Sequence, residues 1–253
     1  MRAVSLLFHD VYVSDPPESG FRSPAADRYK LSLRDFEAQL DGLVRLRIAV
    51  AGGSTSAVMT FDDGGVSYYT LVADRLEALG LRGHCFATTD FIGERGFLTS
   101  QQIRELDARG HVIGTHSVSH PSRFSSLARN EMQREWSDSR KRLEDILGHA
   151  VTAGSVPGGY FSRAVADAAA DAGLLTLFTS EPTTRASIAN GCRVIGRFTI
   201  RRGHSSRMAR RFVSTAPWAR CSAWLGWNAK ALVKPVLGPS YSRVADWILE
   251  PNR

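Results

Sequence analysis

Short apolar runs alternate with amphipathic segments along most of the chain. Runs of about four to eight mainly apolar residues predict strands, and apolar positions that recur every three or four residues predict helices. The predicted strands cover residues 4–8, 57–61, 83–89, 111–117, 152–159, 174–180 and 193–200. The predicted helices cover residues 31–46, 66–79, 99–109, 125–147 and 162–172.

Several boundaries of these helices carry end signals. Ser32, followed by Asp35 three residues later, is typical of a helix start. A glycine follows four of the predicted helices, which is typical of a helix end; these are Gly80, Gly110, Gly148 and Gly173. Strands and helices alternate about seven times, so the pattern predicts a parallel α/β sheet or barrel, with its chemistry at the carboxyl ends of the strands.

The chain changes character after Ile200. The segment 201–253 is rich in arginine and lysine and holds four of the five tryptophans. We therefore divide the chain into a domain at residues 1–203 and a basic, Trp-rich helical extension at residues 204–253. Two interpretations of this extension stay open. It is either a helical cap packed on the barrel, or a peripheral element that contacts a membrane surface or a glycolipid.

Composition narrows the class of partner. The 253 residues carry a formal net charge of +7, which favours anionic partners such as lipid headgroups, phosphorylated carriers or acidic glycans. The basic residues form no recognised nucleic-acid-binding module, so no nucleic acid is expected. No segment has the roughly 18 apolar residues that span a bilayer, and the N-terminal apolar run lacks a cleavage site. We expect a soluble cytoplasmic protein, with peripheral contact at the inner face of the membrane as an open alternative.

Polar side chains gather where the predicted strands end. Asp62 and Asp63 follow an apolar strand side by side, and such a pair is costly to bury unless it faces water or a cation. His116 and His120 follow another strand, and their spacing of four places two rings on one side of a helical turn. Two imidazoles and one carboxylate are a recognised ligand set for a divalent metal. A lone Asp pair is usually a solvated turn, but beside these histidines it favours a metal site.

Three motifs in this order resemble a known family. They are TFDDG at residues 60–64, HSVSHP at 116–121 and the PGG turn at 157–159. Together they are similar to the signature of the polysaccharide deacetylases of the NodB type, carbohydrate esterase family 4. The resemblance covers Val4 to about Ile200 and implies an irregular (β/α)7-type barrel, to which the helical C-terminal appendage is added.

The resemblance also implies roles for individual residues. Asp62 would be the catalytic base, while Asp63, His116 and His120 would bind Zn²⁺, with Co²⁺, Ni²⁺ or Mn²⁺ as alternatives. The turn after the fifth strand would contact substrate and stabilise the oxyanion through Pro157, Gly158, Gly159 and Tyr160.

The general acid is expected at an unusual place. In this family it usually comes from a Leu-His-Asp segment late in the domain, and no such segment follows residue 200. LFHD at residues 7–10 resembles it at the front of the chain, as in circularly permuted members such as the poly-N-acetylglucosamine deacetylases of biofilm systems. We therefore expect His9 to be the acid, with Asp10 as a partner that tunes it. His204 is the rival, and a buried histidine with a purely structural role is the plain alternative for His9.

Two motifs depart from the family pattern. Ser155 stands where the family has an arginine that braces the catalytic Asp, so Arg197 or Arg201 is expected to substitute. The fourth motif, an Asp near a Trp, is not visible in LFTSEP at residues 177–182, where Glu181 is the candidate replacement.

These features predict a metal-dependent hydrolase that removes N-acetyl groups from an N-acetylated sugar in a polysaccharide or a lipid-linked sugar. Another amide or ester hydrolase on the same scaffold remains an alternative, because fold does not set the substrate. A glycan-binding relic is the alternative from a different class. The missing arginine favours it and the intact metal-ligand set opposes it.

Overall fold

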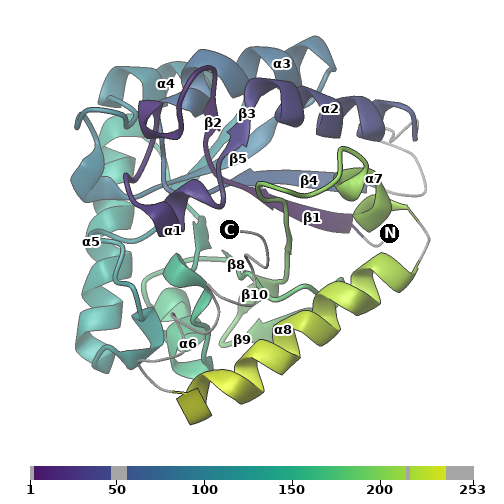
Figure 1. Ribbon diagram of the computed structural model, residues 1–253. Coiled ribbons are helices and arrows are strands. Elements are labelled where there is room, and N and C mark those ends of the chain that lie inside the picture. Colours follow the sequence, from purple (N-terminus) through teal and green to yellow (C-terminus); the bar gives the residue numbers. More distant parts are fainter. Residues whose placement is uncertain (1–2, 47–55, 215–216, 238–253) are drawn as a thin grey trace.

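A curled sheet of nine strands lies at the centre of the computed structural model, which describes residues 3–46, 56–214 and 217–237 (Figure 1). In chain order its strands are β1 (Ala3–Phe8), β4 (Ser56–Phe61), β5 (Gly83–Ala87), β6 (Val112–Thr115), β7 (Ala153–Ser155), β8 (Thr176–Phe178), β9 (Ala186–Ala189), β10 (Cys192–Ile195) and β11 (Phe198–Thr199). A separate parallel pair consists of β2 (Val11–Tyr12) and β3 (Leu31–Ser32).

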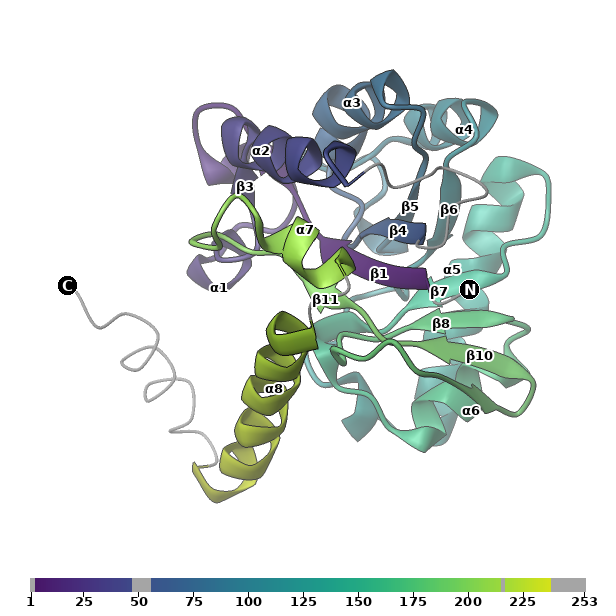
Figure 2. The same ribbon diagram turned by 90° about the vertical axis from the view of Figure 1, so that its right-hand side faces the viewer.

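Helices surround this sheet on its outside (Figures 1 and 2). They are α1 (Pro24–Asp27), α2 (Leu33–Val44), α3 (Ala73–Ala78), α4 (Ser100–Ala108), α5 (Arg129–Leu147), α6 (Arg163–Asp171), α7 (Met208–Val213) and α8 (Pro217–Leu237). Short 3-10 or π-helical turns lie at Pro16–Glu18, Tyr68–Val72, Thr89–Phe91, Phe124–Ser126 and Pro157–Gly159.

The order of the strands confirms the predicted α/β fold. From one edge to the other it is β11-β1-β4-β5-β6-β7-β8-β10-β9, and every neighbouring pair is parallel except β9 and β10. The sheet curls into a half-barrel, and its parallel strands place their carboxyl ends along one rim.

Two of the residues predicted to start or end helices do so in the structure. The Ser32 hydroxyl accepts a hydrogen bond of 3.1 Å from the Asp35 N–H at the start of α2. Gly148 ends α5 with a φ of +78°, a left-handed conformation that favours glycine. The prediction for the start of α5 is wrong by four residues, because Phe124–Ser126 forms a separate 3-10 turn that buries Phe124.

The predicted last strand, residues 193–200, is two strands. β10 pairs with β8, whereas β11 pairs with β1 at the opposite edge of the sheet. Gly196 allows the chain to cross between them, since a Cβ atom there would lie 2.4 Å from the carbonyl oxygen of Glu181. The Arg197 N–H donates to that same oxygen at 2.9 Å. The hairpin strand β9 was not predicted at all.

Two aromatic residues align the strands that carry the first site residues. Phe8 of β1 and Phe61 of β4 are register partners, are both buried, and stack with ring centroids 5.3 Å apart. The Asp62 N–H continues the pairing by donating to the Phe8 carbonyl oxygen at 3.1 Å. This alignment places His9 and Asp62, the next residue on each strand, at the same level of the rim.

The first part of the predicted C-terminal extension packs on the domain. The Gln39 side chain of α2 donates to the Ser205 carbonyl oxygen and accepts from the Ala209 N–H, both at 2.9 Å. α8 then runs from α7 along the outside of the molecule (Figure 2). The boundary after residue 203 stays a prediction, and residues 238–253 of the extension lie outside the described part.

Candidate active site

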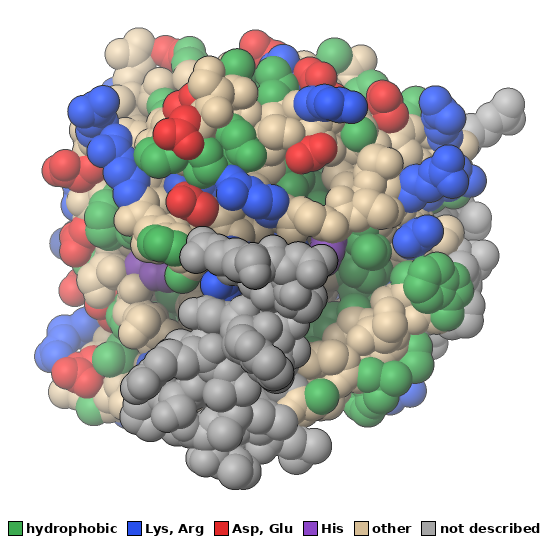
Figure 3. Space-filling view, in the orientation of Figure 1, with side chains coloured by type: hydrophobic (Ala, Val, Ile, Leu, Met, Phe, Trp, Pro, Cys, Tyr) green, Lys and Arg blue, Asp and Glu red, His purple; other side chains and the backbone are tan. Residues whose placement is uncertain are grey.

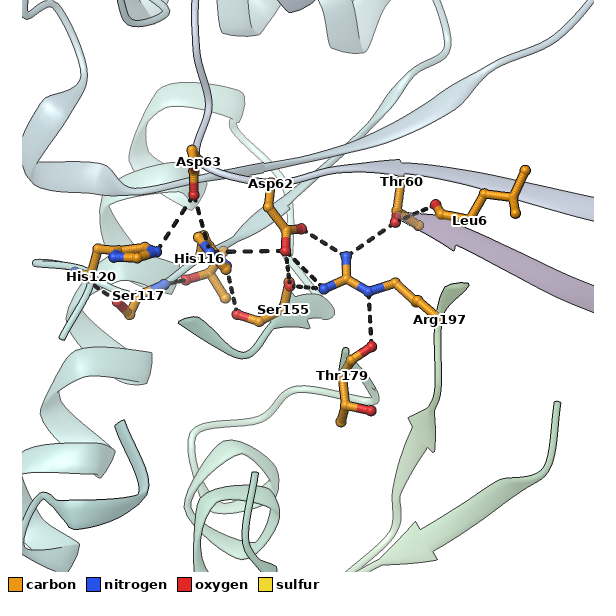
Figure 4. Close-up of polar contacts among 11 residues, drawn as sticks. Leu6, Thr60, Asp62, Asp63, His116, Ser117, His120, Ser155, Thr179 and Arg197 are labelled. Atoms are coloured by element: carbon orange, nitrogen blue, oxygen red, sulfur yellow. Dashed lines mark hydrogen bonds and ion pairs between the residues drawn. The ribbon is translucent and has the colours of Figure 1, made fainter. Parts of the chain in front are cut away.

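Three strand ends bring the candidate residues together. His9 follows β1, Asp62 and Asp63 follow β4, and His116 follows β6. Figure 4 shows the two carboxylates and the imidazoles from HSVSHP converging beside the end of β4. Figure 3 shows histidine side chains reaching this face in two places, one near its middle and one further to the left. The residues predicted for the metal site therefore share one location.

Asp63, His116 and His120 form a compact cluster. Asp63 Oδ1 lies 3.4 Å from His116 Nε2 and 3.5 Å from His120 Nε2, and one ligand atom from each residue lies within 4.8 Å of the others. Ligand atoms bound tetrahedrally to Zn²⁺ at about 2.0–2.1 Å lie about 3.3 Å apart. The three residues therefore fit a shared divalent cation.

The backbone at this cluster is strained. Asp63, Ser117 and His120 have φ angles of +77°, +68° and +57°, and they are three of the four non-glycine residues with positive φ in the described part of the chain. Such conformations cost free energy and persist only where the surrounding structure enforces them. Their concentration at one place indicates that this site has been shaped for a function.

The loop that carries the histidines is held from two sides. His116 Nδ1 donates to the Ser155 carbonyl oxygen at 2.8 Å, which leaves Nε2 free to face Asp63. Glu135 of α5 accepts hydrogen bonds from the N–H groups of residues 118 and 119, at 2.9 and 3.0 Å. Burial lowers the pKa of His120 and so favours the neutral imidazole that can bind a metal.

Asp62 has a different partner, the guanidinium of Arg197. Arg197 Nη1 donates to Asp62 Oδ1 at 2.7 Å and Nη2 donates to Oδ2 at 2.8 Å, a bidentate pair in which both side chains are buried. Burial alone would raise the pKa of Asp62, but the charge and hydrogen bonds of Arg197 hold that pKa below its usual range. Asp62 is thus an ionised carboxylate at the edge of the cluster formed by Asp63, His116 and His120.

Every N–H of the Arg197 guanidinium has an acceptor. Besides the two bonds to Asp62, Nε donates to the Thr179 carbonyl oxygen at 3.0 Å, Nη1 to Thr60 Oγ1 at 3.1 Å and Nη2 to Ser155 Oγ at 2.7 Å (Figure 4). A guanidinium offers five donors in a rigid fork, and all five are used here. Arg197 is therefore locked in position although it is fully buried.

Ser155 takes the place of the expected arginine and connects the two parts of the site. Its hydroxyl donates to Asp62 Oδ2 at 3.0 Å and accepts from Arg197, while its carbonyl oxygen accepts from His116. Arg201, the other candidate to replace the arginine, donates instead to His204 Nε2 at 3.3 Å. Of the two arginines, the structure places Arg197 against Asp62.

His9 lies at the end of β1 near both carboxylates. Burial lowers the pKa of His9, while the charges of Asp63 and Asp62 act in the opposite direction. Its Nδ1 is buried and has no hydrogen-bond partner among the described residues. A buried ring nitrogen without a partner among the described residues, near the candidate metal ligands, is compatible with the predicted acid role, which stays a prediction.

The Asp10 carboxylate is held by two serine side chains. Its Oδ1 accepts hydrogen bonds from Ser19 Oγ at 2.7 Å and from Ser67 Oγ at 3.0 Å. Burial raises the pKa of Asp10 to about 6. A Cβ atom on Gly65 would lie 1.7 Å from Asp10 Oδ1, so the second glycine after the Asp pair makes room for this carboxylate. The described contacts tie Asp10 to the neighbouring loops, and none joins it to His9.

The PGG turn follows β7 directly. Gly158 and Gly159 have φ angles of +63° and +69°, and Pro157 is buried. The ring of Tyr160 lies 5.9 Å from the guanidinium carbon of Arg123. Residues 157–159 of the turn follow Ser155 by two to four positions, so the turn lies beside the site. Contact of these residues with substrate stays a prediction.

One contributor, Glu135, was not predicted from the sequence, and another, Arg197, was predicted only as one of two candidates. Glu135 lies in the middle of a charged helix, and no local pattern distinguishes it from its neighbours. For Arg197, the sequence left Arg201 as an equal candidate. Only the break between β10 and β11, which the structure shows, distinguishes the two arginines. Glu181, the candidate for the missing fourth motif, contacts Arg197 through its backbone oxygen.

Comparison with known proteins agrees with this geometry. A family model described as polysaccharide deacetylase matches residues 49–177, slightly more than half of the chain. The Bacillus subtilis (strain 168) protein YxkH, named as a candidate polysaccharide deacetylase, is 28% identical over 125 residues, which are 49% of this chain and 44% of YxkH. The peptidoglycan-N-acetylmuramic acid deacetylase PdaA of the same strain is 30% identical over 118 residues, which are 45% of this chain and 43% of PdaA. The chain thus spans less than half the length of these curated relatives.

Solved structures share the fold. The Streptococcus pyogenes deacetylase PplD, solved in complex with acetate, superposes with a TM-score of 0.69 at 20% identity, covering 85% of this chain and 99% of PplD. The segment matched by the family model includes Asp62, Asp63, His116 and His120 but ends before Arg197. The predicted circular permutation stays a prediction.

Proposed function

This chain belongs to the polysaccharide deacetylase family, and on that premise we propose that it hydrolyses the N-acetyl group of an N-acetylated sugar in a polysaccharide or glycolipid. The observation that carries the proposal is the position of Asp62. It is an ionised carboxylate fixed by Arg197, and its Oδ2 lies 4.0 Å from Nε2 of His116 in the metal cluster.

The site residues divide the reaction between them. Asp63, His116 and His120 would hold a divalent cation, for which Zn²⁺ is our first candidate. Bound there, such a cation supplies a Lewis acid for the acetyl carbonyl and lowers the pKa of a bound water. Asp62 accepts a proton from the attacking water, and the Arg197 bonds keep its carboxylate ionised and oriented for that step.

His9 is the proposed acid. Protonated His9 donates a proton to the departing sugar nitrogen, so that the products are acetate and an amino sugar. Because burial lowers the pKa of His9, its protonated form is a stronger acid than an exposed imidazolium. A backbone N–H of Gly158 or Gly159 is the proposed donor to the oxyanion.

The alternative that the protein is a glycan-binding relic without catalytic activity loses its main support. It depended on the absence of the arginine that braces the catalytic Asp, and Arg197 supplies a bidentate guanidinium to Asp62 from another part of the chain. Hydrolysis of another amide or ester on this scaffold remains the alternative within the enzyme class.

Location and membrane contact stay predictions. Among the described residues, none of the helices combines the length and apolar character needed to cross a bilayer. The net charge of +7 supports an anionic glycan or lipid-linked sugar as the substrate class.

The proposal is tested by acetate release combined with metal analysis. The protein is loaded with Zn²⁺ and incubated with N-acetylated oligosaccharides, and the variant Asp62→Asn is compared with the wild type. We expect acetate release to fall by about 10²- to 10⁴-fold with unchanged bound metal, because the base is removed and the ligands are kept. Asp145→Asn, an exposed position on α5, is the matched control. Release by Asp62→Asn at the wild-type rate would falsify the base assignment.

A further inference from the structure

The C-terminal helix α8 meets the edge of the candidate site at the PGG turn. A Cβ atom on Gly159 would lie 3.4 Å from Cη2 of Trp227, so the indole lies beside the turn with room for about one methyl group between them. Ser180 lies on the same side, also 3.4 Å from that position. Gly159 itself is four residues after Ser155, which contacts both Asp62 and His116.

The spacing along α8 explains why Trp227 points there. Ala219, Ala223 and Trp227 recur every four residues and lie on one face of the helix. Ala219 is buried and Ala223 packs against the core, so α8 approaches the domain closely through small side chains. Trp227 is the next position on this face and is only half-buried. A large aromatic ring thus reaches the turn without being covered completely.

Other aromatic residues flank the same turn. Tyr160 and Phe161 follow Gly159 directly in the sequence, and Phe161 is 37% exposed. Arg123 lies beside Tyr160. Flat, partly exposed rings offer an apolar surface to the C–H face of a pyranose ring, and such rings lose little conformational entropy on binding.

We propose that Trp227, with the turn beneath it, binds a sugar ring that neighbours the one being deacetylated. This inference rests on the proposed function. It assigns α8, which lies outside the segment matched by the family model, to substrate binding. It also predicts that the enzyme acts better on oligosaccharides than on a single N-acetylated sugar.

Two substitutions separate this role from simple anchoring of α8. Trp227→Leu keeps an apolar side chain for packing but removes the flat ring, whereas Trp227→Phe keeps a ring. Trp224→Leu is the control, because Trp224 is an exposed tryptophan of the same helix, three residues before Trp227. The probes are N-acetylglucosamine and its tetrasaccharides joined by β-1,4 or β-1,6 bonds, with acetate release measured for the Zn²⁺-loaded protein.

We expect Trp227→Leu to raise KM for a tetrasaccharide about tenfold, with kcat and the thermal unfolding midpoint nearly unchanged. KM for the monosaccharide should not change, Trp227→Phe should recover most of the affinity, and Trp224→Leu should behave as the wild type. An unchanged tetrasaccharide KM in Trp227→Leu overturns the inference. An equal rise in KM for the monosaccharide and the tetrasaccharide, together with a lower unfolding midpoint, also overturns it, because Trp227 would then only anchor α8 to the domain. Absence of release from every probe by the wild type contradicts the proposed function, and the inference fails with it.

Discussion

Asp62 and Asp63 are neighbours in the chain, but the structure surrounds them in opposite ways. Asp62 is paired with the permanently charged guanidinium of Arg197 and with the Ser155 hydroxyl. Asp63 faces His116 and His120, whose positive charge depends on protonation. Both carboxylates are buried, and the pKa of each lies below its usual range, that of Asp63 well below.

We call Asp62 with its partners the Asp62 half of the site, and Asp63 with the two histidines the Asp63 half. The two halves differ in the source of the positive charge that compensates the carboxylate. The Asp62 half is complete within the protein, because every donor of Arg197 is used. The Asp63 half is a set of ligand atoms that a divalent cation would complete. We therefore infer that the protein fixes the charge state of the base and leaves that of the metal site to the metal. Substitutions in the two halves should have separable effects.

The largest effect is expected from Arg197→Met, which leaves Asp62 buried without its cation. Loss of one partner of a buried ion pair typically costs about 3–5 kcal/mol of unfolding free energy. Acetate release should also fall, because Asp62 loses both its orientation and its lowered pKa. Urea unfolding and acetate release measure the two effects. Arg201→Met is the control, since Arg201 contacts His204, and a similar loss in both variants would contradict the comparison.

The stability effect of Arg197→Met should depend on pH. In the wild type the folded-state pKa of Asp62 is lowered, so this ion pair contributes stability above the ordinary Asp pKa of about 3.9. That contribution is lost as pH falls towards the folded-state pKa. The difference in unfolding free energy between wild type and variant should therefore be largest near neutral pH and shrink on acidification. A difference that grows on acidification would show that Asp62 is not held ionised.

A smaller effect is expected from His9→Ala, because His9 lies near both carboxylates but is neither a candidate metal ligand nor a partner of Arg197. Acetate release should fall about 10²-fold, because the proposed acid is lost, while bound metal and unfolding free energy change little. His204→Ala is the matched comparison, since His204 is the rival acid, and burial lowers its pKa to about 4 beside Arg201. A greater loss in His204→Ala than in His9→Ala would exchange the two assignments.

The smallest effect is expected from Ser155→Ala. This change removes one hydrogen bond to Asp62 and one acceptor for Arg197 but keeps the bidentate pair and the Ser155 carbonyl bond to His116. We expect a loss of about 1 kcal/mol in unfolding free energy and a few-fold fall in acetate release. If Ser155→Ala is as damaging as Arg197→Met, the serine and not the arginine is the main support of Asp62.

Local patterns in the sequence were sufficient to predict most elements and to select Asp63, His116 and His120, which the structure brings together as candidate metal ligands. Strands such as Ala3–Phe8 and Ser56–Phe61 follow from short apolar runs, and α2 follows from the capping signal at Ser32. The metal-ligand candidates lie in two short motifs, so their types and spacing are visible without a fold. Such features depend on residues within a few positions of one another.

The tertiary structure alone decided which distant residues support that site. The sequence offered Arg197 and Arg201 as equal candidates, and the partner of Asp62, 135 positions away, was settled by the crossing from β10 to β11. The left-handed backbone at Asp63 and His120 and the position of Trp227 beside the PGG turn likewise have no local signal. The physical reason is that periodicity and caps report the preferences of neighbouring residues, whereas the pairing of distant charges and the placement of strained backbone depend on packing of the whole chain.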